Sequence, residues 1–120
     1  NNACVSVDPV QMGWAIESLL SNAHNYTPSG GRVEVQLTQN DHTMRLNVID
    51  SGIGIAKSDQ AHLFDRFFRA QNSINYEMRG VGLGLFIARA VVAMHEGNIE
   101  VQSDLGQGST FSICLPLDET

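Results

Sequence analysis

Two glycine-rich runs constrain this chain more than any other feature of its sequence. The first, Asp50–Ile55, follows an apolar strand predicted over Met44–Ile49 and places a carboxylate beside two glycines. The second, Arg79–Gly84, places three alternating glycines at the start of a predicted helix. A carboxylate can accept a hydrogen bond from an exocyclic amine, and glycines at a helix N-terminus let unpaired N–H groups approach an anion. Together the two runs predict a nucleotide site.

The bulk composition is that of one globular domain, which we expect to span residues 1–120. Of these residues 42% are apolar and 17% are charged, which is ordinary for a folded protein. The net charge of −6 argues against a nucleic-acid partner, and no apolar run is long enough to cross a bilayer, so no direct membrane contact is expected. Cys4 and Cys114 lack metal or redox spacing, and we interpret both as buried, reduced thiols.

The N-terminal part of the chain predicts a long helix. Asp8 and Pro9 are a typical N-cap and first helical residue, and the helix should end near Tyr26, before Pro28. Helical spacing predicts an apolar face formed by Met12, Ile16, Leu19, Leu20 and Ala23. A separate polar stripe carries Ser18, Asn22 and Asn25.

Alternating polar and apolar residues predict two hairpins. The first pairs residues 32–38 with 43–50, and the second pairs residues 98–103 with 109–115. We therefore expect an α+β fold: a two-layer α/β sandwich with a mixed, mostly antiparallel sheet, covered on one face by about three helices.

The segment between the hairpins predicts the remaining helices. Residues 57–68 favour one or two short helices with Ser58 as an N-cap. Residues 69–79 lack periodicity and predict a mobile loop. Residues 82–95 are apolar on almost every face of a helix, which indicates a core helix with Gly97 as its C-terminal cap.

Five motifs occur in an order that resembles the catalytic domain of sensor histidine kinases. These motifs are similar to the asparagine box (Leu19–Pro28), the first glycine box (Asp50–Ile55), the phenylalanine box (Leu63–Arg69), the second glycine box (Arg79–Leu85) and the closing glycine–threonine element (Gly108–Phe111) of that family. The resemblance covers roughly Val7 to Pro116. It implies the Bergerat-type ATP-binding sandwich that this family shares with gyrase, mismatch-repair and chaperone ATPases.

The resemblance also implies roles for individual residues. Asn22 would bind Mg²⁺, with Ser18 as a second candidate ligand, and Asp50 would accept from the adenine amino group. The base pocket would be formed by Tyr26, Gly52, Gly54, Ile55 and Thr110. The phosphates would be held by Asn25 and by the backbone of Gly80, Val81, Gly82, Leu83 and Gly84. Arg69 and Arg79 would reach the terminal phosphates and, with Asn22, form the catalytic set.

Two positions depart from the family pattern. Ser18 stands where the family usually has a second asparagine, and Asn25 stands where it usually has lysine or arginine. Both changes should weaken ATP–Mg²⁺ binding or catalysis, so a nucleotide-sensing pseudokinase module stays open as an alternative. The phosphoacceptor motif is also missing, because His95-Glu96 is followed by Gly97-Asn98.

The implied function is the catalytic domain of a bacterial two-component sensor histidine kinase. It would bind ATP and Mg²⁺ and donate the γ-phosphate to a histidine on the dimerisation domain of the same parent protein, which would serve a response regulator. We expect a cytoplasmic domain whose parent could be an inner-membrane sensor. An ATP hydrolase of the gyrase or chaperone type is disfavoured, because its general-base glutamate would stand where Ser18 lies.

Asn25→Lys is expected to tighten ATP binding more than adenosine binding. A lysine in the polar stripe would point toward the same pocket as Asn22 and reach the phosphates. Added salt should shrink the gain, as for any partly exposed ion contact. Calorimetry with both ligands at two salt concentrations measures this, and equal effects on the two ligands would show that position 25 does not face the phosphates.

Overall fold

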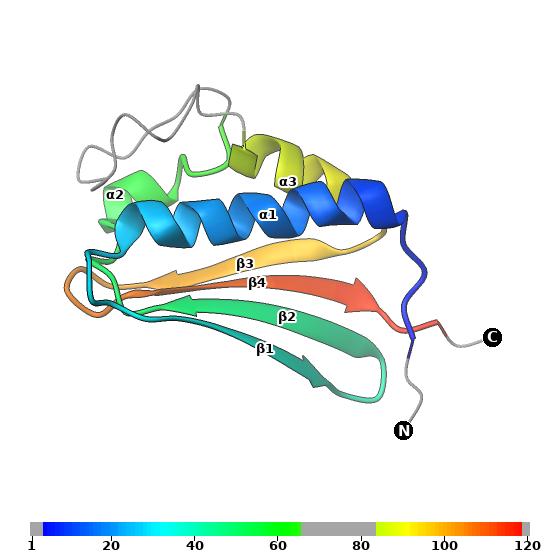
Figure 1. Ribbon diagram of the computed structural model, residues 1–120. Helices are drawn as coiled ribbons and strands as arrows, with labels where there is room; N and C mark the ends of the chain where they lie inside the picture. The colour runs from blue at the N-terminus through cyan, green and yellow to red at the C-terminus, as the bar shows by residue number, and fades with distance from the viewer. Residues whose placement is uncertain (1–3, 66–83, 119–120) are drawn as a thin grey trace.

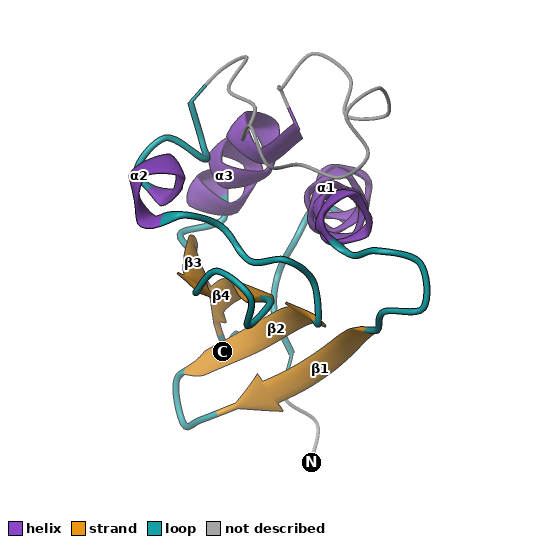
Figure 2. Cartoon of the chain, turned by 90° about the vertical axis from the view of Figure 1, so that its left-hand side faces the viewer, coloured by secondary structure: helices purple, strands orange, loops and turns teal. Residues whose placement is uncertain are grey.

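The computed structural model describes residues 4–65 and 84–118, and these form two layers (Figure 1). In chain order the elements are α1 (Pro9–Tyr26), β1 (Val33–Gln39), β2 (Thr43–Asp50), α2 (Lys57–Gln60), α3 (Gly84–Met94), β3 (Asn98–Ser103) and β4 (Ser109–Pro116). The helices lie on one side of the sheet, with α1 and α3 next to each other (Figure 2). This confirms the predicted α+β class with one covered face.

The four strands are ordered β1-β2-β4-β3, and every pair is antiparallel. Both predicted hairpins are present, and β2 and β4 pair across the centre of the sheet. The expectation of a mixed sheet is wrong for the described residues, because β2 and β4, the one neighbouring pair that no hairpin joins, are antiparallel as well. The register between β2 and β4 places Ser109 opposite Asp50.

Helix α1 begins and ends as the sequence predicts. An oxygen of the Asp8 carboxylate accepts from the N–H groups of Val10 and Gln11, each at 3.0 Å. The predicted apolar face is partly wrong, because Leu20 is 38% exposed while Ala15 is fully buried. Leu20 lies about 100° round the helix from the buried Leu19, beyond the edge that meets the sheet.

Helix α3 is not a core helix, contrary to the prediction from its apolar sequence. Ala88, Val91 and Val92 are buried, but Phe86 and Ile87 are 39% and 40% exposed. The described helices form one layer on the sheet, and no other described helix or strand lies over the outer side of α3. The predicted start of this helix at residues 82 and 83 lies outside the described residues.

The end of α3 differs from the prediction in one detail. Glu96, not Gly97, adopts the left-handed conformation, with a φ of 63°. The N–H of Gly97 then donates to the carbonyl oxygen of Val92 at 3.0 Å, as in a Schellman cap. Gly97 is required for another reason, since a Cβ there would lie 2.2 Å from the carbonyl oxygen of Cys114.

Two smaller predictions are corrected. Helix α2 has only four residues, and its N-cap is Ala56, which makes no side-chain capping bond, so Ser58 lies inside the helix instead of capping it. Neither cysteine forms a disulfide, as expected, but only Cys114 is buried and Cys4 is exposed. Cys4 lies in the N-terminal segment before α1, where no strand or helix covers it.

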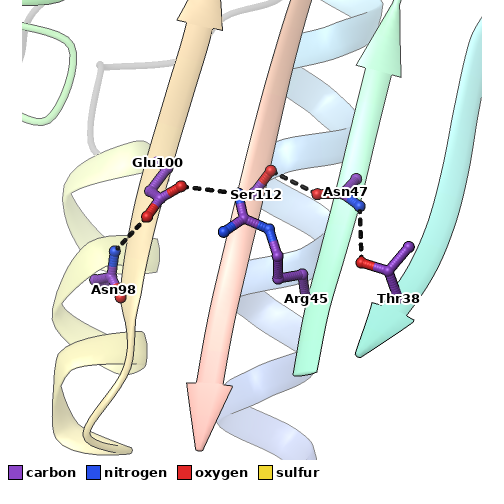
Figure 3. Close-up of polar contacts among 6 residues, drawn as sticks. All are labelled: Thr38, Arg45, Asn47, Asn98, Glu100 and Ser112. Carbon is purple, nitrogen blue, oxygen red and sulfur yellow. Dashed lines mark hydrogen bonds and ion pairs between the residues drawn. The ribbon is translucent and has the colours of Figure 1, made fainter. Parts of the chain in front are cut away.

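The outer face of the sheet is polar (Figure 3). Arg45 on β2 reaches over β4 to Glu100 on β3 at 2.8 Å, and this pairing lowers the pKa of Glu100. Ser112 on β4 donates to Asn47 on β2 at 2.6 Å. These contacts tie three strands together on the side that no helix covers.

None of the helices in the described part of the chain combines the length and apolar character needed to cross a bilayer.

Gly97→Ala is expected to destabilise the domain, and Gly13→Ala is its matched control. The new methyl group at position 97 would overlap the Cys114 carbonyl, so the free energy of unfolding should fall by more than about 1 kcal/mol. A Cβ at Gly13, inside α1, meets nothing within 4 Å, so alanine there should add about 0.5–1 kcal/mol. Urea unfolding followed by circular dichroism measures both changes. Equal stability of the two variants would contradict the role given to Gly97.

Candidate functional site

The candidate site is centred on Asp50, the last residue of β2. Its side chain is only 4% exposed. One carboxylate oxygen, Oδ1, accepts from the N–H of Gly52 at 2.9 Å. The other oxygen, Oδ2, is buried and has no hydrogen-bond partner among the described residues. Asp50 therefore presents an unused acceptor inside the domain.

The pKa of Asp50 is raised above its ordinary value, and burial is the largest cause. The backbone N–H groups of Gly52 and Ser109 oppose this by stabilising the charged form. The protein thus holds a desolvated carboxylate whose hydrogen bonding is only partly satisfied. Unsatisfied buried acceptors are costly, so a ligand that donates to Oδ2 would recover part of that cost.

Close backbone packing holds Asp50 in this position. A Cβ at Gly52 would lie 2.0 Å from the carbonyl oxygen of Tyr26, and that oxygen accepts from the N–H of Ile53 at 3.0 Å. Gly54 has a φ of +77°, and a Cβ there would lie 2.1 Å from the carbonyl oxygen of Asp104. The two glycines of the predicted site are therefore needed to bring the end of α1, the segment after β2 and the β3–β4 turn together.

The polar stripe of α1 runs toward the first turn of α3. A Cβ at Gly84, the first residue of α3, would lie 3.5 Å from the Oγ of Ser18. The Nδ2 atom of Asn22 is buried and has no hydrogen-bond partner among the described residues. Asn25 and Tyr26, near the end of α1, are both buried. The end of α1 thus reaches the Asp50 region through the Tyr26 carbonyl, which lies against Gly52, and Ser18 on the same helix lies next to Gly84 of α3.

Thr110 does not lie where the sequence analysis places it. Side chains alternate along β4, and Phe111 points into the core, so Ser109 shares the helix-facing side while Thr110 is on the outer face. Ser109 is buried directly opposite Asp50, whereas Thr110 pairs with Ile49 and is half-buried. Thr110 borders a cavity of about 170 Å³ beside Asp50, at the end of the sheet. The geometry favours Ser109 next to the open carboxylate oxygen.

The sequence did contain a signal for Ser109. Phe111 is the residue of β4 most certain to enter the core, and counting two residues back along a strand gives the same face. The remaining candidates of the phosphate side, namely Arg69, Arg79, Gly80, Val81, Gly82 and Leu83, lie outside the described residues, as does the loop predicted over 69–79.

Comparison with known proteins agrees with this arrangement. Residues 7–119 match the family described as histidine kinase-, DNA gyrase B- and HSP90-like ATPase. The chain belongs to this family. It is 42% identical over 102 residues to the sensor histidine kinase RppB of Synechocystis sp., a match that covers 85% of this chain and 22% of RppB. It is 40% identical over 116 residues to the sensor-like histidine kinase SenX3 of Mycobacterium tuberculosis, covering 97% of this chain and 28% of SenX3.

Solved structures of sensor histidine kinases share the fold of this chain. The mycobacterial sensor histidine kinase MprB superposes with a TM-score of 0.85 at 35% identity, over 97% of this chain and 78% of that chain. Full-length ShkA, solved in complex with AMPPNP, superposes with a TM-score of 0.77 at 27% identity, over 92% of this chain and 22% of ShkA. The chain is thus a catalytic ATPase domain of the sensor histidine kinase type. It spans about a quarter of the length of the curated relatives it matches.

Asp50→Asn is expected to keep or raise the free energy of unfolding at pH 7. The folded pKa of Asp50 is higher than its ordinary value of 3.8, so the folded state binds the proton more tightly than the unfolded chain. The contribution of Asp50 to stability is therefore fully present below pH 3.8 and is lost as the pH rises through the folded pKa. Asparagine keeps an oxygen for the Gly52 N–H without a buried charge.

Urea unfolding of wild type and variant between pH 4 and 7 measures this effect. The stability of Asp50→Asn relative to wild type should increase with pH. Asp41→Asn, in the exposed turn between β1 and β2, is the control and should show no such trend. A variant that loses stability as the pH rises would contradict the burial argument.

Proposed function

We propose that this domain binds ATP together with Mg²⁺ and supplies the γ-phosphate to a histidine on the dimerisation domain of its parent protein. The observation that carries the proposal is the buried Asp50 carboxylate, with Oδ1 held by Gly52 and Oδ2 unpartnered in the described residues. An acceptor-only group of this kind suits the amino group of adenine and does not suit a base that presents a carbonyl oxygen at the same place.

The surroundings of Asp50 support a pocket for a flat base. Ile55 and Tyr26 are buried apolar residues of the core, and Gly52 and Gly54 let the segment after β2 pack closely against the backbone of Tyr26 and Asp104. Ser109 lies opposite Asp50 and offers a hydroxyl group on the same face. We assign these residues to the base, with Thr110 at the margin of the site.

The phosphate side is proposed to lie between α1 and the start of α3. The N-terminus of a helix carries unpaired N–H groups, and Gly84, the first described residue of α3, lies next to Ser18. Asn25 and the segment Gly80–Leu83 are assigned to the phosphates as well. Arg69 and Arg79 are assigned to the terminal phosphates, where a guanidinium can pair with two oxygens at once.

A Mg²⁺ ion fits the residues on α1. Asn22 brings an amide oxygen, and Ser18 adds a hydroxyl one turn earlier. The buried atom of Asn22 without a partner among the described residues is its nitrogen Nδ2, a donor that would face a phosphate oxygen and not the ion. Mg²⁺ takes hard oxygen ligands and usually keeps several waters, so one or two protein ligands are enough. When bound, the ion would neutralise charge on the phosphates, while Asn22 and Ser18 orient it.

The chemistry that this arrangement supports is positioning plus charge stabilisation. The partner histidine would attack the γ-phosphorus in line as its bond to the leaving ADP oxygen breaks. No glutamate stands one turn before Asn22, where a hydrolase of this superfamily would need its general base, because Ser18 occupies that place. ATP hydrolysis by the domain itself is therefore disfavoured, and a response regulator would be the next acceptor.

A nucleotide-sensing module without kinase activity is the second candidate. Ser18 replaces an amide, and Asn25 is an uncharged, buried residue where a cation would help bind phosphate. An assay for the transfer of radiolabelled γ-phosphate to the dimerisation domain of the parent protein distinguishes the kinase from the sensing module. Labelled histidine supports the kinase, and tight nucleotide binding without labelling supports the sensing module.

The domain is expected to bind ADP and ATP in a Mg²⁺-dependent way but to release phosphate very slowly. Asp50→Asn should weaken ADP by roughly 1.5–3 kcal/mol, or about 10- to 150-fold, because the variant can present a donor to the adenine amine. Calorimetry and a steady-state phosphate-release assay measure the two properties. The control Asp41→Asn, at the other end of β2, should bind like wild type.

The ADP affinity of the variant and the turnover of the domain can each contradict the proposal. ADP affinity unchanged in Asp50→Asn, with an unchanged circular dichroism spectrum, would remove Asp50 from the base site. Turnover near 1 s⁻¹, a typical enzyme rate, would favour an ATP hydrolase over a kinase domain.

A further inference from the structure

Residues 51–56 form irregular backbone at the end of the sheet, and Gly52, Gly54 and Ile55 within it are buried. Ile55 is fully buried, and it directly follows Gly54 with its positive φ. Buried N–H and C=O groups outside regular helices and strands need other hydrogen-bond partners. For Ile55 both partners are side chains, and they come from two different elements.

Ser103, the last residue of β3, holds the N–H group of Ile55. Its Oγ accepts from that N–H at 2.8 Å and donates to the carbonyl oxygen of Gly108 at 3.0 Å. The Oγ of Ser109 lies 2.7 Å away, which is hydrogen-bond distance between the two hydroxyl groups. Ser103 therefore connects Ile55 to the residue that lies opposite Asp50.

Gln60, the last residue of α2, holds the carbonyl group of Ile55. Its Nε2 donates to the oxygen of Ile55 at 2.8 Å and to the backbone oxygen of Ser103 at 2.9 Å. Both amide hydrogens are used, and both acceptors are at the edge of the site. One side chain thus joins α2, the segment after β2 and the end of β3.

Resting on the adenine site proposed above, we propose that Ser103 and Gln60 are positioning residues for nucleotide binding. They act on the nucleotide through Ile55, whose backbone they hold beside Asp50 from two sides. They also tie α2 to the base pocket, so a displacement of α2 would move one wall of that pocket. Neither residue belongs to the motifs that predicted the site.

The same hydrogen bonds could serve only to stabilise the fold, and the two roles predict different results. When the Ser103 or Gln60 side chain is removed, the backbone N–H and C=O groups around Ile55 can hydrogen-bond to water in the free protein instead. Nucleotide binding then has to reverse that change, so affinity falls even where the protein remains folded. Because only the base side is affected, adenosine and ADP should lose affinity by the same factor.

The test compares a disruptive and a conservative variant at each position, in the 120-residue chain. Ser103→Ala removes the hydroxyl and Ser103→Thr keeps it; Gln60→Leu removes both donors and Gln60→Lys keeps donors on a long side chain. Calorimetry gives the affinity for ADP and for adenosine, and urea unfolding gives stability. Hydrogen exchange followed by NMR reports the protection of the Ile55 amide, with that of Val48 in β2 as an internal reference.

Ser103→Ala and Gln60→Leu should each weaken ADP and adenosine by about tenfold, on the order of one lost buried hydrogen bond. Ser103→Thr and Gln60→Lys should stay within about threefold of wild type. Exchange at Ile55 should accelerate in Ser103→Ala while Val48 keeps its protection.

Three results would overturn the inference. Lower stability with unchanged affinity for both ligands would make the two side chains purely structural. A loss confined to ADP would place their effect on the phosphate side, and failure of both conservative variants to rescue affinity would remove the hydrogen bonds as its cause. In each case wild type still binds ADP and Asp50→Asn still weakens it; if wild type does not bind ADP, the proposed function itself fails.

Discussion

The burial of the Asp50 carboxylate shapes the rest of this domain. A charged group at the end of a central strand is costly unless its surroundings supply hydrogen bonds, and here the N–H of Gly52 supplies one to Oδ1. Three chain segments pack backbone to backbone around Gly52 and Gly54 at this end of the sheet. The other oxygen, Oδ2, has no hydrogen-bond partner among the described residues, and we propose that the nucleotide supplies it.

Under the proposed function, this arrangement exchanges stability for nucleotide binding. Burial raises the pKa of Asp50, which disfavours the charged form in the folded state, so we expect an uncharged side chain to fit the fold as well or better. The hydrogen bonds of Ser103 and Gln60 explain how the irregular segment beside it stays ordered without strand or helix partners. In the proposed function, nucleotide affinity and local order therefore depend on the same few residues.

Local patterns predicted the elements wherever short-range chemistry decides the conformation. The N-cap at Asp8 with Pro9 after it specifies the start of α1, and strict alternation specifies both hairpins. Predictions of burial were weaker. Leu20 and the outer side of α3 are apolar and nevertheless exposed, because a helix sequence alone does not show how far the sheet beneath it extends.

The sequence by itself determined the family, the order of the elements and the carboxylate at the end of β2, since each follows from residue types at fixed spacing. The tertiary structure alone decided which side chains meet at that carboxylate. Ser109 replaces Thr110 beside Asp50 through strand register, and Gln60 reaches Ile55 and Ser103 through the packing of α2. Contacts between residues far apart in the chain depend on how layers pack, and no local pattern encodes that geometry.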